Sequence, residues 1–191
     1  MRLARAAAPW SVRPADLAAA GLAVLLPLAS GCGLIGFGTT PAEVPDQMTV
    51  TSPDFGQGLS GSAFSCHGPG NHPVIYWSGA PRGTQSFALV MDDSAAPITP
   101  YIYWIVFNIS RLSSDIPPGH LLPPTQEGVN SKGTVGYDPP CPANRGHEYR
   151  FTVYALSKKL KLPAQANAKT AWSAIAASAI ARGRLTAVID P

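Results

Sequence analysis

The sequence has little charge and no long charged run. Only 13% of its 191 residues are charged, and the 14 basic and 11 acidic side chains are spread along the chain. Proteins that bind the phosphate backbone of nucleic acids need a dense basic patch, so this composition argues against a nucleic-acid partner. With 46% apolar residues the chain is also unlike an intrinsically disordered protein. The length suits one domain with an appendage.

The N-terminus has the features of an export signal. Three arginines precede an apolar run from Leu17 to Leu28, which is short for a membrane span, and small residues lead directly to Cys32. Small residues followed by cysteine resemble the bacterial lipobox, in which the cysteine sulfur receives a diacylglycerol and becomes the mature N-terminus. We therefore expect a lipoprotein signal peptide over residues 1–31 and acylation of Cys32. The protein would then be anchored in the lipid bilayer, on the outer face of the cell membrane.

Metal-binding motifs are absent from the sequence, and cysteines are few. The four His and three Cys residues form no Cys-x-x-Cys or His-x-x-x-His motif, so we expect neither a metal site nor a cofactor. Once Cys32 is assigned to lipidation, Cys66 and Cys141 are left. In an exported protein they form either one disulfide or two buried thiols, and the sequence leaves both alternatives open.

The sequence after the signal peptide predicts a tether followed by one domain rich in β-strands. Residues 32–47 are rich in Gly, Thr and Pro, which predicts a flexible tether, and the folded domain is expected over residues 48–191. Runs of β-branched and aromatic residues predict four strands, over 86–91, 101–109, 150–156 and 184–189.

The spacing of apolar residues in two segments predicts further features of the domain. Alternation along 150–156 puts Phe151, Val153 and Ala155 on one face, which predicts a sheet with one solvated face. Between Pro163 and Gly183, apolar residues recur at helical spacing and predict an amphipathic packing helix over 164–182.

Two segments carry the residues best suited to chemistry. Asp92 and Asp93 end a predicted strand, and because adjacent carboxylates repel, one of them should face a polar cleft or accept backbone N–H bonds. In the second segment, alternation sends His147, Tyr149 and Phe151 to one face. From composition alone, a structural histidine is the commoner interpretation of His147.

Taken in order, several short motifs resemble the phosphatidylethanolamine-binding protein family, in the bacterial branch often called Raf kinase inhibitor-like. The resemblance covers residues 51–156 and implies a mainly β fold, in which a large antiparallel sheet packs against a smaller sheet, with a C-terminal amphipathic helix. The matching motifs are Thr51-Ser52-Pro53-Asp54-Phe55, Cys66-His67-Gly68, Trp77-Ser78-Gly79, Asp92-Asp93 with Ala96-Pro97, Trp104 with Asn108, Gly136-Tyr137 with Pro140-Cys141-Pro142, and Gly146-His147-Glu148-Tyr149.

The resemblance also implies a small cavity for an anion such as phosphate or a phospholipid headgroup. By position its lining falls on Asp93, Tyr103, His147 and Tyr149, although Tyr103 replaces a histidine of the family and Ala95 replaces an acid. A tyrosine with a pKa near 10 offers a neutral hydroxyl, whereas a histidine can be protonated near neutral pH. We therefore expect weaker binding of phosphate-like anions than in relatives with both histidines.

Three classes of function follow. The favoured one is a membrane-tethered, non-enzymatic binding protein with an anion or headgroup pocket. The alternative is an extracytoplasmic protein–protein regulator such as a protease inhibitor, which would present the extended surface loop expected between Pro117 and Pro124. A thiol hydrolase built on Cys141 and His147 is disfavoured, because Cys141 lies between two prolines with no helix N-terminus behind it to activate the thiol.

Overall fold

The computed structural model describes residues 43–56, 61–93 and 100–191. The chain divides into two units, Met1–Thr40 and Pro41–Pro191, and all described residues belong to the second. The predicted signal peptide, Cys32 and the turn after Asp93 therefore lie outside the described residues. In the described ranges, no helix is both long enough and apolar enough to cross a membrane.

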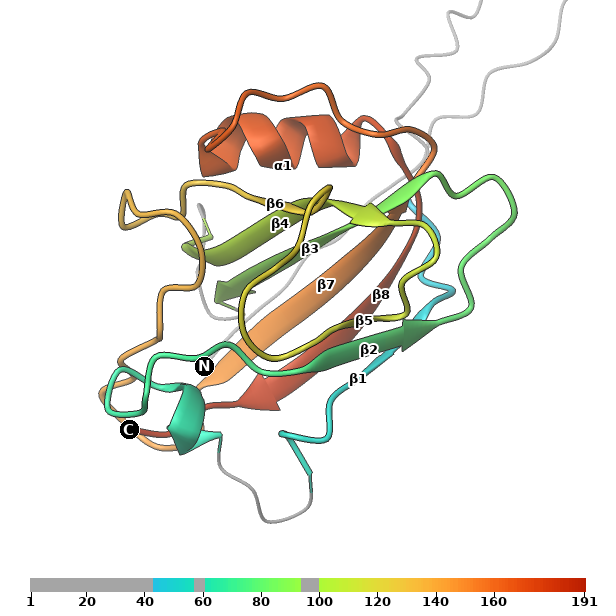
Figure 1. Ribbon diagram of the computed structural model, residues 1–191. Helices are drawn as coiled ribbons and strands as arrows, with labels where there is room; N and C mark the ends of the chain where they lie inside the picture. Colours follow the sequence, from blue (N-terminus) through green and yellow to red (C-terminus); the bar gives the residue numbers. More distant parts are fainter. Residues whose placement is uncertain (1–42, 57–60, 94–99) are drawn as a thin grey trace, which may run out of the picture. The chain divides into compact units, whose positions relative to one another are not determined.

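Five antiparallel strands form the larger sheet, in the order β6-β4-β3-β7-β8 (Figure 1). The predicted strands 86–91, 101–109 and 150–156 fall on the three central ones, where β-branched and aromatic side chains pack well on a pleated surface. The strands are β3 (Ser86–Asp93), β4 (Ile102–Ser110), β6 (Gln126–Glu127), β7 (Glu148–Leu156) and β8 (Ala179–Val188).

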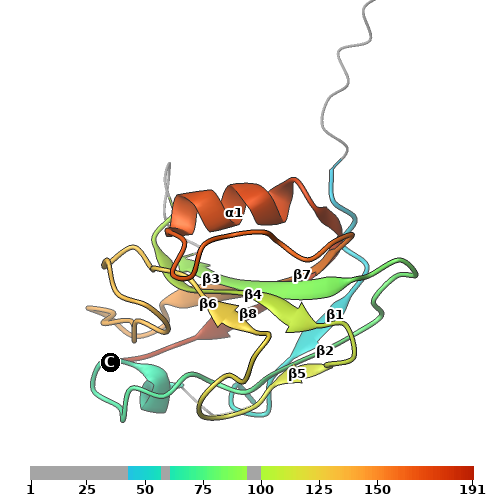
Figure 2. The same ribbon diagram turned by 45° about the horizontal axis from the view of Figure 1, so that its top comes forward.

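A smaller antiparallel sheet packs on one face of the larger one, and helix α1 (Ala168–Ala176) lies on the other (Figure 2). The core between the sheets takes alternate residues of β3 and β7, such as Leu89 and Val153, neither of which is exposed. This arrangement confirms the predicted fold class. The smaller sheet comprises β1 (Thr49–Thr51), β2 (Ile75–Ser78) and β5 (Asp115–Ile116), and a short 3-10 helix, η1 (Ser62–Phe64), precedes β2.

The prediction of one solvated face is wrong for the central strands. Thr152 and Tyr154, on the second face of β7, are only 3% and 8% exposed. Helix α1 covers this face, and its Ala171 and Ile175 are buried in a second hydrophobic cluster with residues of β3, β4 and β7. At the sheet edge, Arg184 of β8 is exposed.

The predicted helix over 164–182 is too long. The helix starts after Asn167, whose side-chain oxygen accepts a hydrogen bond of 2.9 Å from the Thr170 backbone, and it ends at Ala176. Residues 179–182 belong instead to β8, which pairs with almost the whole of β7. Gly183 is therefore no helix terminator. A β-carbon there would lie 2.3 Å from the Met48 backbone oxygen, so the close approach of β8 to this segment requires glycine.

The segment before Met48 pairs with β8. The backbone N–H groups of Gln47 and Met48 donate to the Arg182 carbonyl at 3.1 and 3.0 Å, and the Arg182 N–H donates to the Pro45 carbonyl at 2.9 Å. The Arg182 side chain pairs with Asp46, with Nε 3.3 Å from Oδ1. The described end of the predicted tether, residues 43–47, thus runs along β8, because its backbone groups are paired there.

Candidate functional site

Strand pairing puts three of the predicted site residues on one face of the larger sheet. Asp93 ends β3 and is the direct partner of Tyr149 in β7. Direct partners in an antiparallel pair share a face, and so do residues two apart, which adds His147. His147 Nε2 lies 3.1 Å from Asp93 Oδ2, and its ring centroid lies 4.9 Å from that of Tyr149.

A β-bulge brings in the fourth residue, Tyr103. Met91 pairs with Trp104, but its neighbour Asp92 pairs with Ile102, so Tyr103 is an extra residue in β4. A bulge of this kind changes the direction of a side chain. The Tyr103 ring lies edge-on to Tyr149, with centroids 5.2 Å apart and an interplanar angle of 89°. The four predicted residues therefore lie together at one end of the sheet.

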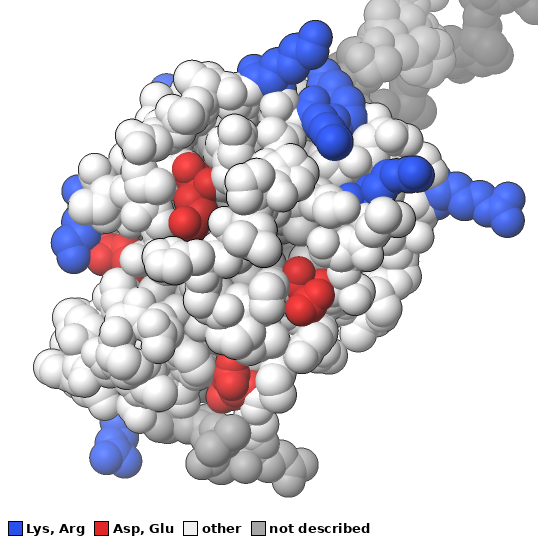
Figure 3. Space-filling model, in the orientation of Figure 1, with Lys and Arg blue, Asp and Glu red and all other residues white. Residues whose placement is uncertain are grey.

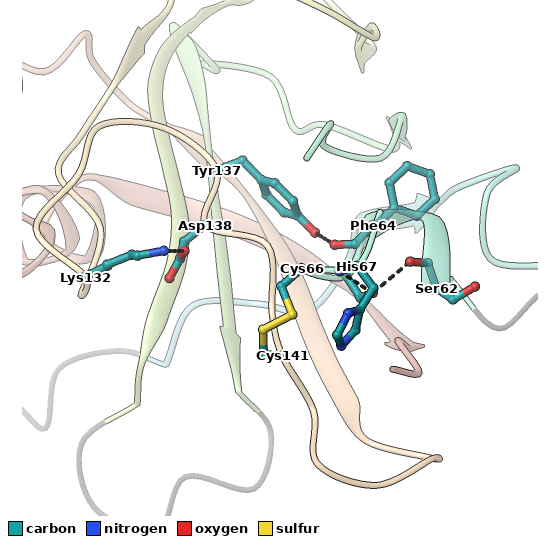
Figure 4. Close-up of a disulfide and its surroundings, with 9 residues drawn as sticks. Ser62, Phe64, Cys66, His67, Lys132, Tyr137, Asp138 and Cys141 are labelled. Atoms are coloured by element: carbon teal, nitrogen blue, oxygen red, sulfur yellow. Dashed lines mark hydrogen bonds and ion pairs between the residues drawn. A yellow bond between two sulfur atoms is a disulfide. The ribbon is translucent and has the colours of Figure 1, made fainter. Parts of the chain in front are cut away.

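A disulfide between Cys66 and Cys141 holds the loop that leads to His147 (Figure 4). Of the two alternatives that the sequence leaves open, the structure has the disulfide, with the Cα atoms 5.2 Å apart. Beside it, the Cys66 N–H donates to the Pro140 carbonyl at 2.9 Å, and the Tyr137 hydroxyl donates to the Phe64 carbonyl at 2.7 Å. These contacts join helix η1 to the segment 137–141.

The end of β8 fixes the backbone on the other side of the site. Gly146 adopts a left-handed conformation with φ of 80°, which a glycine allows without strain. Its N–H donates to Asp190 Oδ1 at 2.7 Å, and the Ile189 N–H donates to the His147 carbonyl at 3.1 Å. His147 is thus held between the disulfide-bonded loop and the C-terminus.

Solvent reaches the site at its rim. The side chains of His147 and Asp93 are 34% and 19% exposed, and Tyr103 is half-buried. Tyr149 is only 1% exposed and forms the floor below Tyr103. A ligand that arrives from solvent therefore meets His147 and Asp93 first.

Burial raises the pKa of both tyrosines of the site. Desolvation, followed by the negative charge of Asp93, raises the pKa of Tyr103 above its ordinary value of 10. Desolvation, followed by the neighbouring Tyr103, raises the pKa of Tyr149. The site therefore contains two neutral hydroxyls, one imidazole and one carboxylate, and the buried Tyr149 hydroxyl interacts with that of Tyr103. In the part of the chain that the structure describes, no three His, Cys, Asp or Glu side chains are grouped so that they could hold a metal ion.

The adjacent Asp92 has a different role. It lies on the opposite face, is 3% exposed and pairs with Arg150, whose Nε donates to Asp92 Oδ1 at 3.3 Å and whose Nη2 contacts Oδ2. Burial raises the pKa of Asp92, and Arg150 opposes this effect. Arg150 Nη2 also donates to the Asp93 carbonyl at 3.3 Å, so the ion pair steadies the backbone of the site residue.

The sequence analysis missed three residues that border the site. The Tyr101 ring lies 4.6 Å from that of Tyr103, and its hydroxyl donates to Asp138 at 2.8 Å. Lys132 Nζ lies 3.0 Å from the same carboxylate (Figure 4). Desolvation and the bond to Asp138 raise the pKa of Tyr101 to about 12. Its position two residues before Tyr103 is the signal that could have identified it.

Similar proteins share both the sequence and the fold. A protein named "Putative lipoprotein LppC" from Mycobacterium tuberculosis is 36% identical over 193 residues, which cover 91% of this chain and 95% of its own. The "UPF0098 protein" of Aquifex aeolicus is 40% identical over 114 residues, or 56% of this chain and 66% of its own.

Two crystal structures match the fold. CT736 of Chlamydia trachomatis, described as a "Putative PhosphatidylEthanolamine-Binding Protein (PEBP) Homolog", has a TM-score of 0.64 at 30% identity and covers 74% of this chain and 95% of its own. YbcL of E. coli, a member of the same family, has a TM-score of 0.66 at 29% identity and covers 76% and 99%. The family model for phosphatidylethanolamine-binding protein matches residues 49–190, and the chain therefore belongs to the phosphatidylethanolamine-binding protein family.

Proposed function

We propose that this chain is a non-enzymatic binding protein of the cell envelope, which takes a small anion or a phospholipid headgroup at Asp93, Tyr103, His147 and Tyr149. One observation carries the proposal: these four side chains come from distant parts of the sequence and lie together at one partly exposed position. The family to which the chain belongs supports the class of ligand.

His147 supplies the charge that attracts an anion. Its Nε2 faces a carboxylate of Asp93, which can only accept, so the proton belongs on Nε2. In the neutral imidazole, Nδ1 then carries a lone pair that repels a phosphate oxygen. In the imidazolium, Nδ1 becomes a donor. An anion therefore binds to the imidazolium form of His147 and not to the neutral ring.

Calorimetric titration of the protein with phosphoethanolamine tests this site. Binding that is lost in His147→Ala and kept in His67→Ala, which alters an exposed histidine outside the site, supports the proposal. Equal heats of binding for the wild type and His147→Ala would show that His147 does not bind the ligand.

The disulfide supports a non-enzymatic function. A thiol hydrolase needs a free thiolate as its nucleophile, and Cys141 is bonded to Cys66. The pair of Cys141 and His147 that the sequence suggested thus has no thiol to activate.

The same proposal includes a lipid anchor at Cys32 and removal of residues 1–31, with the domain held on the outer face of the cell membrane. The name of the similar protein LppC describes a lipoprotein and supports this part. Mass spectrometry of the protein extracted from its host membrane tests it. A mature N-terminal peptide that begins at acylated Cys32 is expected, and an unmodified Cys32 would contradict the anchor.

A protein–protein regulator such as a protease inhibitor is a second candidate. One observation favours it: Leu122 is 77% exposed in the loop between Pro117 and Pro124. A panel of extracellular proteases tests this alternative. Inhibition that Leu122→Ala abolishes would support it, and a panel without inhibition would reject it.

A further inference from the structure

One end of the domain carries a group of exposed basic side chains that form no ion pair with any described residue. In the sequence these side chains belong to three separate segments: the loop between β2 and β3, the turn after β4, and the segment after β7. We call this group the basic end; it consists of Arg82, Arg111, Lys158, Lys159 and Lys161.

The sheet register brings the three segments together. Ser86 at the start of β3 pairs with Ser110 at the end of β4 and with Leu156 at the end of β7. Arg111 and Lys159 line one hollow of about 370 Å³, and the three lysines line a neighbouring one of about 480 Å³. Figure 3 shows basic side chains gathered at the upper right of one face, while acidic ones lie in its middle and lower parts.

An apolar side chain stands within this group. Leu112 is 85% exposed and lines the same hollow as Arg111 and Lys159. A cationic surface with a projecting apolar side chain suits the boundary between anionic headgroups and acyl chains. Such a combination distinguishes a membrane-binding surface from a merely solvated charged one.

The first described residues lie at the same end. The segment 45–48 is bonded to Arg182, which pairs with Tyr154, two residues before the end of β7. Ten residues lie between Cys32 and Glu43, and even fully extended they span at most about 40 Å. An anchor at Cys32 therefore leaves the basic end within reach of the bilayer.

The candidate ligand site lies at the opposite end of the sheet. Asp93 is seven residues beyond Ser86 along β3, which corresponds to about 23 Å in a strand. A domain that rests on its basic end thus holds the Asp93 and His147 side chains away from the surface beneath it.

We propose that the basic end docks on the anionic phospholipid surface of the membrane that holds the anchor, and that this contact directs the ligand site away from the bilayer. The inference rests on the proposed lipid anchor. Each basic side chain near an anionic surface adds to the attraction, which acts within about 10 Å at moderate salt.

Vesicle sedimentation tests the contact without the anchor. The two solved relatives align over nearly their whole length with about three quarters of this chain, so a chain that starts at Gly33 keeps the complete fold. We expect this chain to bind vesicles containing about a third phosphatidylglycerol and not vesicles of phosphatidylcholine alone, with loss of binding at high salt. The variant Arg111→Ala/Lys159→Ala should bind at least about tenfold more weakly.

The control Arg145→Ala/Lys169→Ala removes the same charge from exposed positions outside the basic end and should bind like the wild type. Equal binding to both kinds of vesicle, or an equal loss in the two double variants, would overturn the inference. An unmodified Cys32 together with charge-dependent vesicle binding would instead reject the proposed anchor and leave the docking surface standing.

Discussion

Replacement of Tyr103 by histidine should strengthen anion binding, and only in acid. Tyr103 lies beside Asp93 and Tyr149 at the half-exposed rim of the site, where its hydroxyl is a neutral donor. An imidazolium there donates a charge-assisted hydrogen bond. Such bonds contribute about 1 kcal/mol more than neutral ones, so the affinity for phosphoethanolamine should rise about fivefold near pH 6.

The same substitution should weaken the fold slightly. It removes the contacts of the Tyr103 ring with Tyr149 and Tyr101, at centroid distances of 5.2 and 4.6 Å. Aromatic pairs contribute about 0.5–1.5 kcal/mol each, so we expect Tm to fall by a few degrees. Binding and stability therefore change in opposite directions, which excludes general stabilisation as the cause of tighter binding.

Calorimetry of Tyr103→His at about pH 6 and about pH 8 measures the effect, since histidine with a pKa near 6.5 is charged mainly at the lower value. The control is Tyr76→His, a change at a position 45% exposed in the smaller sheet. An equal gain at both pH values, or no gain at either, would refute the reasoning that charge at position 103 limits anion affinity.

Three further predictions concern stability. Cys141→Ser opens a disulfide between residues 75 apart and should lower the free energy of unfolding in urea by about 4 kcal/mol on the chain-entropy estimate; a loss below about 1 kcal/mol would contradict a formed bond. Gly183→Ala drives a β-carbon toward the Met48 carbonyl and should lower stability by about 1–3 kcal/mol, whereas Thr186→Ala at an exposed position of the same strand should change it little. Burial raises the pKa of Tyr101, Tyr103, Tyr137, Tyr149 and Tyr154, so their contribution to stability is complete below pH 10 and is lost as the pH rises further. At about pH 10.5, urea should therefore increase the tyrosinate absorbance, and an unchanged absorbance would disprove the raised values.

The central strands could be predicted from the sequence because their side chains are mostly apolar, as buried strands require. Residues 86–91 are mostly apolar, residues 150–156 are rich in β-branched and aromatic residues, and both ranges fall within observed strands. The strands of the smaller sheet span only two to four residues, which is too short for a periodic pattern.

The end of the helix could not be predicted from local spacing. Ala179 and Ile180 fit both a helical stripe and the start of a strand, and the pairing of β8 with β7 decides between them. Likewise, the covering of the second face by α1 depends on tertiary packing and not on the alternation within β7.

The residues that form the site could be predicted from the sequence, but their arrangement in space could not. Asp93, Tyr103, His147 and Tyr149 followed from the resemblance to a family, and alternation alone supported the common face of His147 and Tyr149. The bulge that turns Tyr103 toward Tyr149 is a feature of register, which one strand does not reveal. For the same reason the basic end could not be predicted, since its three segments lie far apart in the sequence.

The most direct test of the binding site is a crystal structure of the protein grown with phosphoethanolamine near pH 6. We expect the phosphate within hydrogen-bond distance of His147 Nδ1 and the Tyr103 hydroxyl, beside Asp93. An ordered ligand elsewhere on the protein, with these side chains unoccupied, would contradict the account.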